Sequence, residues 1–294
     1  MREIDYYELG ATLYIPILQK NLKDILKQKK YIFLKSIVIC LEDSTALCDV
    51  PEGMAILEEI VKEFNPTTLK VFIRPRDIDN LKDILEFKNI DKIDGFALAK
   101  FDTKNISDYL SIFSEKKDFY IMPILETIDV FDVTKLEIIS QKLIPFKERV
   151  LSIRVGGEDI LSLLDTMREE HHTLYEIMPI YLVVSNIINT FKPKGFHISS
   201  IVYSSFSDNK TLSRELDGDI SHRLFNKTSI HPNQIELIQN RYKVSSKDYN
   251  IAQELLSCNK AIISLNGRMY EKSTHSNWAK SVIRRYSVYG LIDE

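Results

Sequence analysis

Carboxylate side chains follow two short apolar runs of the chain. The run 120–125 leads into Glu126, and the run 150–155 leads through two glycines to Asp159. The two acids are about one strand–helix unit apart. Because consecutive strands of a parallel barrel end side by side on one face, both acids can reach the same hard divalent cation, which prefers oxygen ligands. The spacing therefore predicts an enzyme with a metal site.

Other charged residues stand at the ends of similar runs. Acids directly after a buried strand need a cation or a basic partner, since burying a lone charge is unfavourable. An arginine at such a position can bind a substrate carboxylate through two parallel hydrogen bonds. Gly156 and Gly157 would let the backbone approach a ligand closely. One rim of the predicted barrel then carries eight charged side chains, namely Glu42, Asp43, Arg74, Arg76, Lys100, Glu126, Glu158 and Asp159.

Two of these residues have a second interpretation. Arg74 either contacts the substrate or forms a structural ion pair with Glu42 or Asp43. Lys100 is either a Schiff-base nucleophile or a cation that neutralises the acids. We expect Arg74, Arg76, Lys100 and the two glycines to contact the substrate.

Short apolar runs alternate with longer helical patterns over most of the chain. The runs are continuous rather than alternating, which is typical of strands covered by helices on both faces. Eight of them in a βα rhythm predict an α/β fold, a TIM (β/α)8 barrel. The predicted strands are 12–15, 36–41, 70–74, 95–99, 120–125, 150–154, 197–203 and 228–231, and the predicted helices include 51–64, 78–87, 105–115, 130–141 and 160–169.

Two segments depart from this rhythm. The segment 175–190 predicts an additional helix before the seventh strand. Near the end, the pattern predicts a helix over 246–259, a strand over 261–265, a turn at Asn266-Gly267 and a basic helix over 276–286. We therefore expect a catalytic barrel domain at 1–245. The C-terminal helical extension, 246–294, is too small to fold alone and should pack on the barrel or on a neighbouring subunit.

The composition fits a cytoplasmic enzyme. The 294 residues are 44% hydrophobic, which is enough for a large core. The net charge of −3 is spread along the chain, which argues against nucleic-acid binding. The three cysteines show no metal or disulfide spacing. The first residues are too polar for a secretion signal, and no stretch is apolar enough to span a membrane.

The motifs, taken in order, resemble the HpcH/HpaI aldolase and citrate lyase β-subunit family over nearly the whole chain. The resemblance is closest to its divergent carbon–carbon bond lyase branch, which is associated with tellurium-resistance gene clusters. The motifs are Leu13-Tyr-Ile-Pro16, Leu41-Glu-Asp43, Val71-Phe-Ile-Arg74, Gly95-Phe-Ala-Leu-Ala-Lys100, Ile124-Leu-Glu-Thr127, Gly157-Glu-Asp-Ile160, Ile230-His-Pro-Asn-Gln234 and Asn266-Gly-Arg-Met269.

This resemblance implies a role for each motif residue. It implies Mg²⁺, or Mn²⁺ in its place, bound by Glu126 and Asp159, with Asp159 rather than Glu158 favoured by the motif alignment. Arg74 would bind the carboxylate or carbonyl end of the substrate. The acids after the second strand, Glu42 and Asp43, would approach the metal through water or orient the substrate, and Glu42 is the candidate for moving a proton. The resemblance also implies a homo-oligomer, either a trimer or a hexamer.

Three departures from the family pattern concern the substrate. The loop after Pro16 lacks the glycine and arginine that help to hold coenzyme A in relatives, which argues against a coenzyme A thioester. Cys40 replaces a frequent aspartate, and Arg76 replaces a frequent asparagine, which favours a dicarboxylic or phosphorylated substrate. We expect a Mg²⁺-dependent carbon–carbon lyase acting on a small carboxylate. The alternatives are a class II aldolase acting without coenzyme A on a phosphorylated or sugar-like acid, and a catalytically inactive barrel that binds a metabolite.

Overall fold

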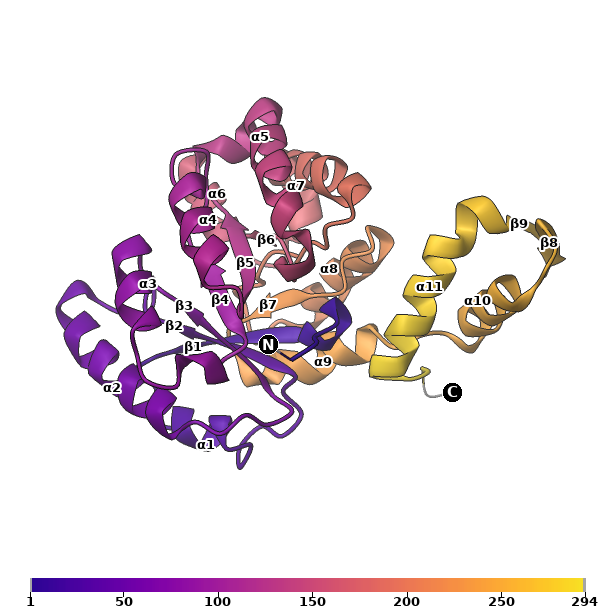
Figure 1. The fold of residues 1–294 in the computed structure, drawn as a ribbon. Coiled ribbons are helices and arrows are strands. Elements are labelled where there is room, and N and C mark those ends of the chain that lie inside the picture. Colours follow the sequence, from indigo (N-terminus) through magenta and orange to yellow (C-terminus); the bar gives the residue numbers. More distant parts are fainter. Residues whose placement is uncertain (1, 293–294) are drawn as a thin grey trace. The chain divides into compact units, whose positions relative to one another are not determined.

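The computed structural model describes residues 2–292 of the chain. Contacts between residues divide the chain into two compact units, Met1–Ile235 and Glu236–Glu294. The first unit holds a parallel sheet with surrounding helices, and the second holds three helices and a β-hairpin (Figure 1).

Seven parallel strands form the sheet of the first unit. They lie side by side in the order β6-β5-β4-β3-β2-β1-β7 (Figure 1). Every residue of β2 and β5 is buried, as expected for strands covered by helices on both faces. The strands are β1 (Ala11–Pro16), β2 (Ser36–Cys40), β3 (Lys70–Arg74), β4 (Gly95–Leu98), β5 (Tyr120–Leu125), β6 (Arg154–Val155) and β7 (Lys227–Ser229).

The segment 197–203 links the two edges of this sheet. Parallel bridges join Ile153 to Ile198 and Ser200 to Lys227. The segment therefore occupies the strand position between β6 and β7, although its pairing is too short to form a regular strand. With this eighth position filled, the structure confirms the predicted (β/α)8 barrel.

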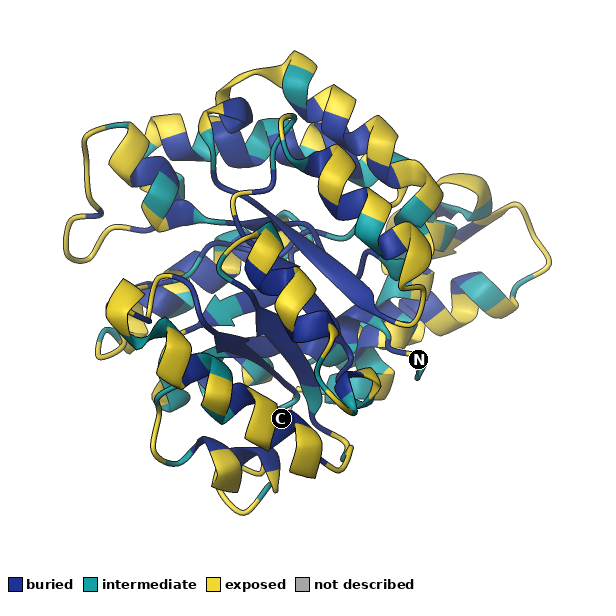
Figure 2. Cartoon of the chain, turned by 60° about the vertical axis from the view of Figure 1, so that its left-hand side comes forward, coloured by how far each residue is buried: buried dark blue, intermediate teal, exposed yellow. Residues whose placement is uncertain are grey.

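Amphipathic helices surround the barrel. In α2, for example, Leu57, Ile60 and Val61 are buried at the spacing of one helix face. Figure 2 shows buried residues on the sheet side of the helices and exposed residues on their outer side. The helices are α1 (Leu22–Leu26), α2 (Val50–Glu63), α3 (Ile78–Leu85), α4 (Ile106–Glu115), α5 (Val133–Leu143), α6 (Gly157–Leu163), α7 (Met178–Phe191) and α8 (Asn209–Ser221).

Two elements near the sixth strand differ from the prediction. Of the predicted strand 150–154, only its last residue, Arg154, belongs to β6, and Val150 makes a single bridge to β5. The helix predicted over 160–169 begins earlier, at Gly157, and ends at Leu163. It stops there because Asp165 has a φ of 52°, a left-handed conformation that an α-helix does not contain. The early start places Glu158 and Asp159 in the first turn of α6.

The connection from β3 to α3 is fixed by side-chain hydrogen bonds. The carboxylate of Asp77 accepts a hydrogen bond of 2.8 Å from the backbone N–H of Asn80 and so caps α3. The side-chain oxygen of Asn80 in turn accepts one of 3.0 Å from the backbone N–H of Arg76. These bonds hold the backbone that carries Arg74 and Arg76.

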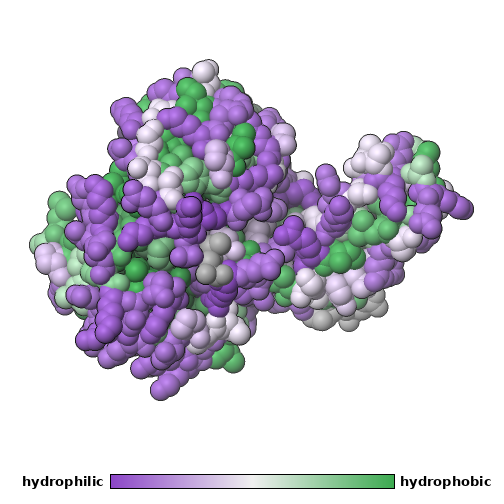
Figure 3. All heavy atoms as spheres, in the orientation of Figure 1, coloured by the Kyte–Doolittle hydropathy of each residue, from purple (hydrophilic) through white to green (hydrophobic). Residues whose placement is uncertain are grey.

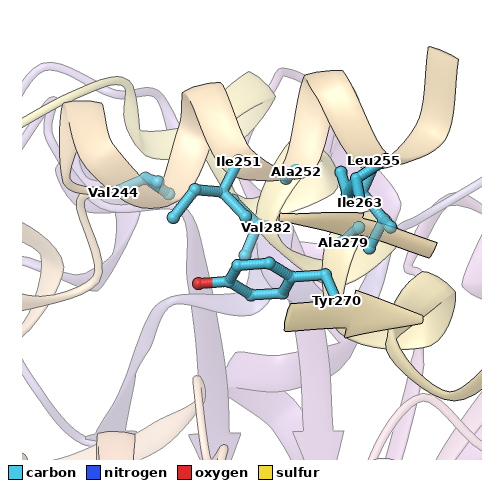
Figure 4. Packing of buried hydrophobic residues seen from close by; sticks show 8 residues of the cluster. All are labelled: Val244, Ile251, Ala252, Leu255, Ile263, Tyr270, Ala279 and Val282. Carbon is cyan, nitrogen blue, oxygen red and sulfur yellow. The ribbon is translucent and has the colours of Figure 1, made fainter. Parts of the chain in front are cut away.

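The second unit has its own small core. Its helices are α9 (Ile235–Arg241, from Glu236 on), α10 (Ser246–Ser257) and α11 (Lys272–Tyr289), and its hairpin pairs β8 (Ile262–Leu265) with β9 (Arg268–Glu271). Asn266 and Gly267 both have positive φ, which tight two-residue hairpin turns require. Figure 4 shows the core side chains between these elements, namely Val244, Ile251, Ala252, Leu255, Ile263, Tyr270, Ala279 and Val282.

Hydrophilic side chains cover most of the face of the molecule seen in Figure 3. This agrees with helices that turn their polar side outward. Within residues 2–292, no helix has both the length and the apolar character needed to cross a membrane.

A buried ion network attaches β7 to α8. The ammonium group of Lys227 lies 2.7 Å from Glu215 and 3.0 Å from Asp219, and all three side chains are fully buried. Arg168 also pairs with Glu215, at 2.6 Å. Because side chains alternate along a strand, Lys227 faces α8 while its neighbour Thr228 faces the interior of the barrel, where it accepts a hydrogen bond from Arg154.

The network predicts that Lys227→Met destabilises the protein. The substitution leaves the buried carboxylate of Asp219 without a cation and leaves Glu215 with Arg168 alone, which should lower the free energy of unfolding by about 3–5 kcal/mol. Lys82→Met is the matched control, because Lys82 forms an exposed ion pair with Asp79. It should cost about 0.5 kcal/mol or less. Urea unfolding measures both effects, and equal losses would show that the network does not stabilise the fold.

Candidate active site

A cavity of about 350 Å³ opens at the carboxyl ends of the barrel strands. Its wall combines five of the eight predicted strand-end charges with apolar side chains, whereas Glu42, Arg76 and Lys100 are not part of the lining. It is lined by Tyr14, Pro16, Cys40, Asp43, Ser44, Arg74, Ile124, Glu126, Arg154, Val155, Gly156, Gly157, Glu158, Asp159, Val202, Thr228 and Ile230.

Arg74 is buried among three carboxylates. One terminal nitrogen lies 2.5 Å from Glu42 and 3.3 Å from Glu126, and the other lies 3.0 Å from Asp43. Burial by itself would lower the pKa of Arg74, but Glu126 and the other nearby groups raise it above its ordinary value. The guanidinium is therefore a permanent cation, and the ion pairs that the sequence left as an alternative are present.

Lys100 is the second cation of the cluster. Its ammonium group is half-exposed and lies 2.9 Å from Glu42 and 3.3 Å from Asp159. Burial lowers the pKa of Lys100, but the hydrogen bond to Glu42 and the surrounding carboxylates raise it further, so the net shift is upward. An ammonium held in this charged form is a poor nucleophile. The geometry thus favours Lys100 as the neutralising partner of the acids.

Glu126 is the most buried carboxylate of the cluster, with 4% of its surface exposed. One oxygen accepts a hydrogen bond of 2.7 Å from the backbone N–H of Lys100, whose φ of 49° points this group at the acid. Burial, together with the charge of Asp159, raises the pKa of Glu126 to about 7 despite the opposing effect of Arg74. The site therefore has a carboxyl group that is readily protonated near neutral pH.

The two glycines before the acids of α6 make room for protein side chains. A Cβ atom at Gly156 would overlap the side chain of Glu126, and one at Gly157 would overlap Ile201. Both glycines line the cavity. In the structure, the close approach that they permit is made by Glu126 and Ile201.

Glu42 and Asp43 are pushed toward different protonation states. Burial raises the pKa of Glu42 above its ordinary value, and Arg74 opposes this only in part. Burial acts in the same direction on Asp43, but hydrogen bonding with Glu42 and the charge of Arg74 lower its pKa overall. Neighbouring acids whose pKa values are shifted in opposite directions are typical of acid–base pairs in enzymes. This difference makes Glu42 the better proton carrier and Asp43 the fixed anion.

Arg76 lies outside the lining of the cavity. One of its terminal nitrogens donates hydrogen bonds to the backbone oxygens of Thr45, at 3.0 Å, and Glu42, at 3.4 Å. These carbonyl groups belong to the turn after β2, where no strand partner satisfies them. Arg76 thus holds the loop that carries Glu42 and is not positioned as a substrate contact.

Arg154 is a cavity residue that sequence reasoning missed. Its side chain is 1% exposed and lines the cavity together with Tyr14 and Thr228. The signal was present in the sequence as a charged residue inside the apolar run 150–155, since a buried charge requires a partner.

Two carboxylates of the cavity are suited to a divalent metal. Within residues 2–292, no three His, Cys, Asp or Glu side chains form a preassembled metal cluster. Mg²⁺, however, is usually held by one or two carboxylates and completes its shell with water and substrate oxygens. Glu126 and Asp159 line the same cavity and interact electrostatically. Their donor type and number therefore fit Mg²⁺.

Comparison with known proteins places the chain among lyases. The model of the family "C-C bond lyase of the TIM-barrel fold" matches residues 3–291. No curated protein sequence matches the chain.

Several solved structures share the fold at low sequence identity. CitE from Mycobacterium tuberculosis, in complex with magnesium, acetoacetate and coenzyme A, has a TM-score of 0.68 and 16% identity, covering 95% of this chain and 98% of its own. A citrate lyase from Burkholderia xenovorans LB400 has a TM-score of 0.75 and 15% identity, and the match covers 96% of this chain and 93% of that protein. The citrate lyase β subunit from M. tuberculosis, with oxaloacetate and magnesium, has a TM-score of 0.59 and 15% identity, and the match covers 80% of this chain and 98% of that protein.

The raised pKa of Glu126 predicts a pH-dependent stability of the metal-free protein. The folded protein keeps the proton of Glu126 up to about pH 7, whereas an ordinary glutamate releases it near 4.5. Because the folded state then binds more protons, the free energy of unfolding should fall as pH rises through this range, by on the order of 1 kcal/mol per pH unit.

Urea unfolding of wild type and Glu126→Gln with a chelator present measures this contribution. The variant cannot ionise at this position and should lack this part of the pH dependence. Parallel pH profiles for the two proteins would contradict the assignment of the titration to Glu126.

Proposed function

The chain belongs to the carbon–carbon bond lyase family of the TIM-barrel fold, and from this premise we propose that it cleaves or forms a carbon–carbon bond in a small oxyacid bound beside Mg²⁺. We assign the metal to Glu126 and Asp159. The observation that carries this proposal is the meeting of these two carboxylates with Arg74 and Lys100 at the mouth of one barrel.

The cluster carries more negative than positive charge, which suits the binding of a divalent cation. Glu42, Asp43, Glu126 and Asp159 provide four carboxylates, whereas Arg74 and Lys100 provide two cations. A divalent metal would neutralise the remaining negative charge. When bound, Mg²⁺ supplies a Lewis acid that stabilises negative charge as it develops on a substrate oxygen.

Arg74 and Lys100 add fixed positive charge on the same side. Arg74 is buried and held by three carboxylates, so it needs no reorganisation as charge develops in the transition state. Lys100 lies between Glu42 and Asp159 and keeps these acids together. The two cations favour an enolate over the neutral carbonyl compound.

Glu42 is the residue that we propose to carry the proton. Its raised pKa means that it holds a proton more readily than an ordinary glutamate. Its contact with Lys100 connects it to the exposed edge of the cluster, through which a proton can exchange with solvent.

The proposed substrate is a free acid rather than a coenzyme A thioester. One related CitE structure contains coenzyme A, acetoacetate and magnesium. In this chain, the loop after β1 reads Pro16-Ile-Leu-Gln-Lys20 and has no arginine. This composition offers less to a nucleotide phosphate than an arginine would.

The proposed metal site predicts which carboxylates control Mg²⁺ affinity. At about pH 8, where Glu126 is ionised, wild type should bind Mg²⁺ saturably. Glu126→Gln should weaken binding by at least about tenfold, since even loss of a second-shell group typically costs 10–100-fold. Asp159→Asn should have a comparable effect, and both variants should lose lyase turnover.

Glu158→Gln is the comparison variant, because Glu158 lines the same cavity as the exposed neighbour of Asp159, and the motif alignment favours Asp159 as the ligand. It should keep Mg²⁺ affinity within about threefold, well short of a ligand loss. Calorimetric titration measures all four proteins. A wild type that binds no divalent cation at millimolar concentration would favour the inactive metabolite-binding barrel instead.

A further inference from the structure

Arg154 is a buried cation surrounded by neutral groups. Its terminal nitrogens donate hydrogen bonds to Asn226 at 3.2 Å and Thr228 at 2.7 Å. Its guanidinium carbon lies 5.2 Å from the centre of the Tyr14 ring. No carboxylate of residues 2–292 lies within 4.0 Å of its nitrogens, the limit for an ion pair.

Other buried cations of the barrel are neutralised. Arg74 has three carboxylate partners, Lys227 has two and Arg168 has one. A buried charge without a counter-ion is strongly unfavourable for the ligand-free protein. Arg154 thus differs from these buried cations in having no carboxylate partner among the described residues, and it lines the cavity.

The guanidinium has hydrogen-bonding capacity left over. Its Nε atom is buried and has no hydrogen-bond partner. Of the four terminal N–H groups, three point to Asn226, Thr228 and the sulfur of Met122, so one terminal N–H and the Nε–H remain for an oxygen of a carboxylate or a phosphate. Because Arg154 lines the cavity, a ligand in the cavity can use these donors.

We propose that Arg154 binds a second anionic group of the substrate, remote from the end held by the metal. This inference rests on the proposed function and defines its substrate class as an oxyacid with two anionic groups. The second group is a carboxylate or a phosphate, because both suit the guanidinium equally well in shape and charge.

Arg74 is less suited to this task. It is already engaged by Glu42, Asp43 and Glu126, so a substrate carboxylate would have to replace one of these ion pairs. A ligand at Arg154 displaces no protein anion. The cavity lining therefore combines carboxylates suited to a metal with a cation suited to an anion.

The surroundings hold Arg154 in place for this role. The amide nitrogen of Asn226 donates to the backbone oxygen of Gly10, at 2.5 Å, and to Thr12, at 2.9 Å. These bonds turn the amide oxygen of Asn226 toward Arg154. The ring of Tyr14 adds a cation–π contact. The guanidinium is thus preorganised before a ligand binds.

Pairs of ligands that differ only in the second group test the proposal. In the first pair, malate has a carboxylate where α-hydroxybutyrate has a methyl group. In the second pair, phosphonopyruvate has a phosphonate where α-oxobutyrate has a methyl group. With saturating Mg²⁺, wild type should bind at least one dianion about tenfold or more tightly than its matched monoanion, the range expected for a charge-assisted hydrogen bond. The preferred pair identifies carboxylate or phosphate as the second group.

Variants at Arg154 then locate the preference. Arg154→Gln keeps a donor for Asn226 but removes the charge, and it should bring the affinity ratio to within about twofold of unity. Arg154→Lys keeps the charge and should retain part of the ratio. Arg149→Gln, at a partly buried arginine that donates to the backbone oxygens of Phe113 and Lys116, should keep the wild-type ratio.

The outcomes separate this inference from the proposed function. Thermal melting shows whether each variant is folded, and a wild-type ratio near unity overturns the inference whether or not the variants fold. An unchanged ratio in folded Arg154→Gln also overturns it. Mg²⁺ titration of the same samples tests the proposed function separately, because Arg154→Gln should bind Mg²⁺ as wild type does. Absence of Mg²⁺ binding in wild type would reject the metal site, and malate titration without metal would still decide the role of Arg154.

Discussion

The clustering of like charges at the ends of parallel strands is the constraint on which this structure depends. Four carboxylates meet at the mouth of the barrel, and they can do so only because Arg74 and Lys100 lie between them. The strand pairing sets this arrangement, since Arg74 ends β3 directly beside Cys40, two residues before Glu42. The same low-polarity surroundings that strengthen these ion pairs also raise the pKa of Glu126 and Glu42. Stability and reactivity thus have a common origin in this cluster.

The cavity combines two opposite electrostatic environments. Near Glu126 and Asp159, the negative charge exceeds what the protein itself neutralises, which suits a divalent metal. Near Arg154, a positive charge lacks a protein counter-ion. A substrate bearing anionic groups at both ends, with one end coordinated to the metal, would satisfy both environments. In the absence of ligands, each of them costs folding free energy, as is common at functional sites.

Periodicity was sufficient to predict the barrel and the face that carries its charges. Continuous apolar runs identified the strands, and the acids after β2, β5 and β6 converge in the structure as expected from parallel strand ends. Sequence could not show where long side chains point. Arg76 turns to backbone carbonyls of the neighbouring loop, and Gly156 makes room for Glu126. Arg154 was overlooked because its neighbours across the barrel come from β1, β5 and β7, which are distant in the sequence.

The proposed chemistry depends on a divalent metal held by Glu126 and Asp159. The most direct test is an anomalous difference map from crystals of the protein soaked in Mn²⁺, which can replace Mg²⁺ in sites of oxygen ligands. Metal binding by Glu126 and Asp159 predicts one strong peak in the barrel cavity, about 2.1 Å from oxygens of both carboxylates. A peak that contacts other groups but not Glu126, or a cavity without any peak at saturating Mn²⁺, would contradict it.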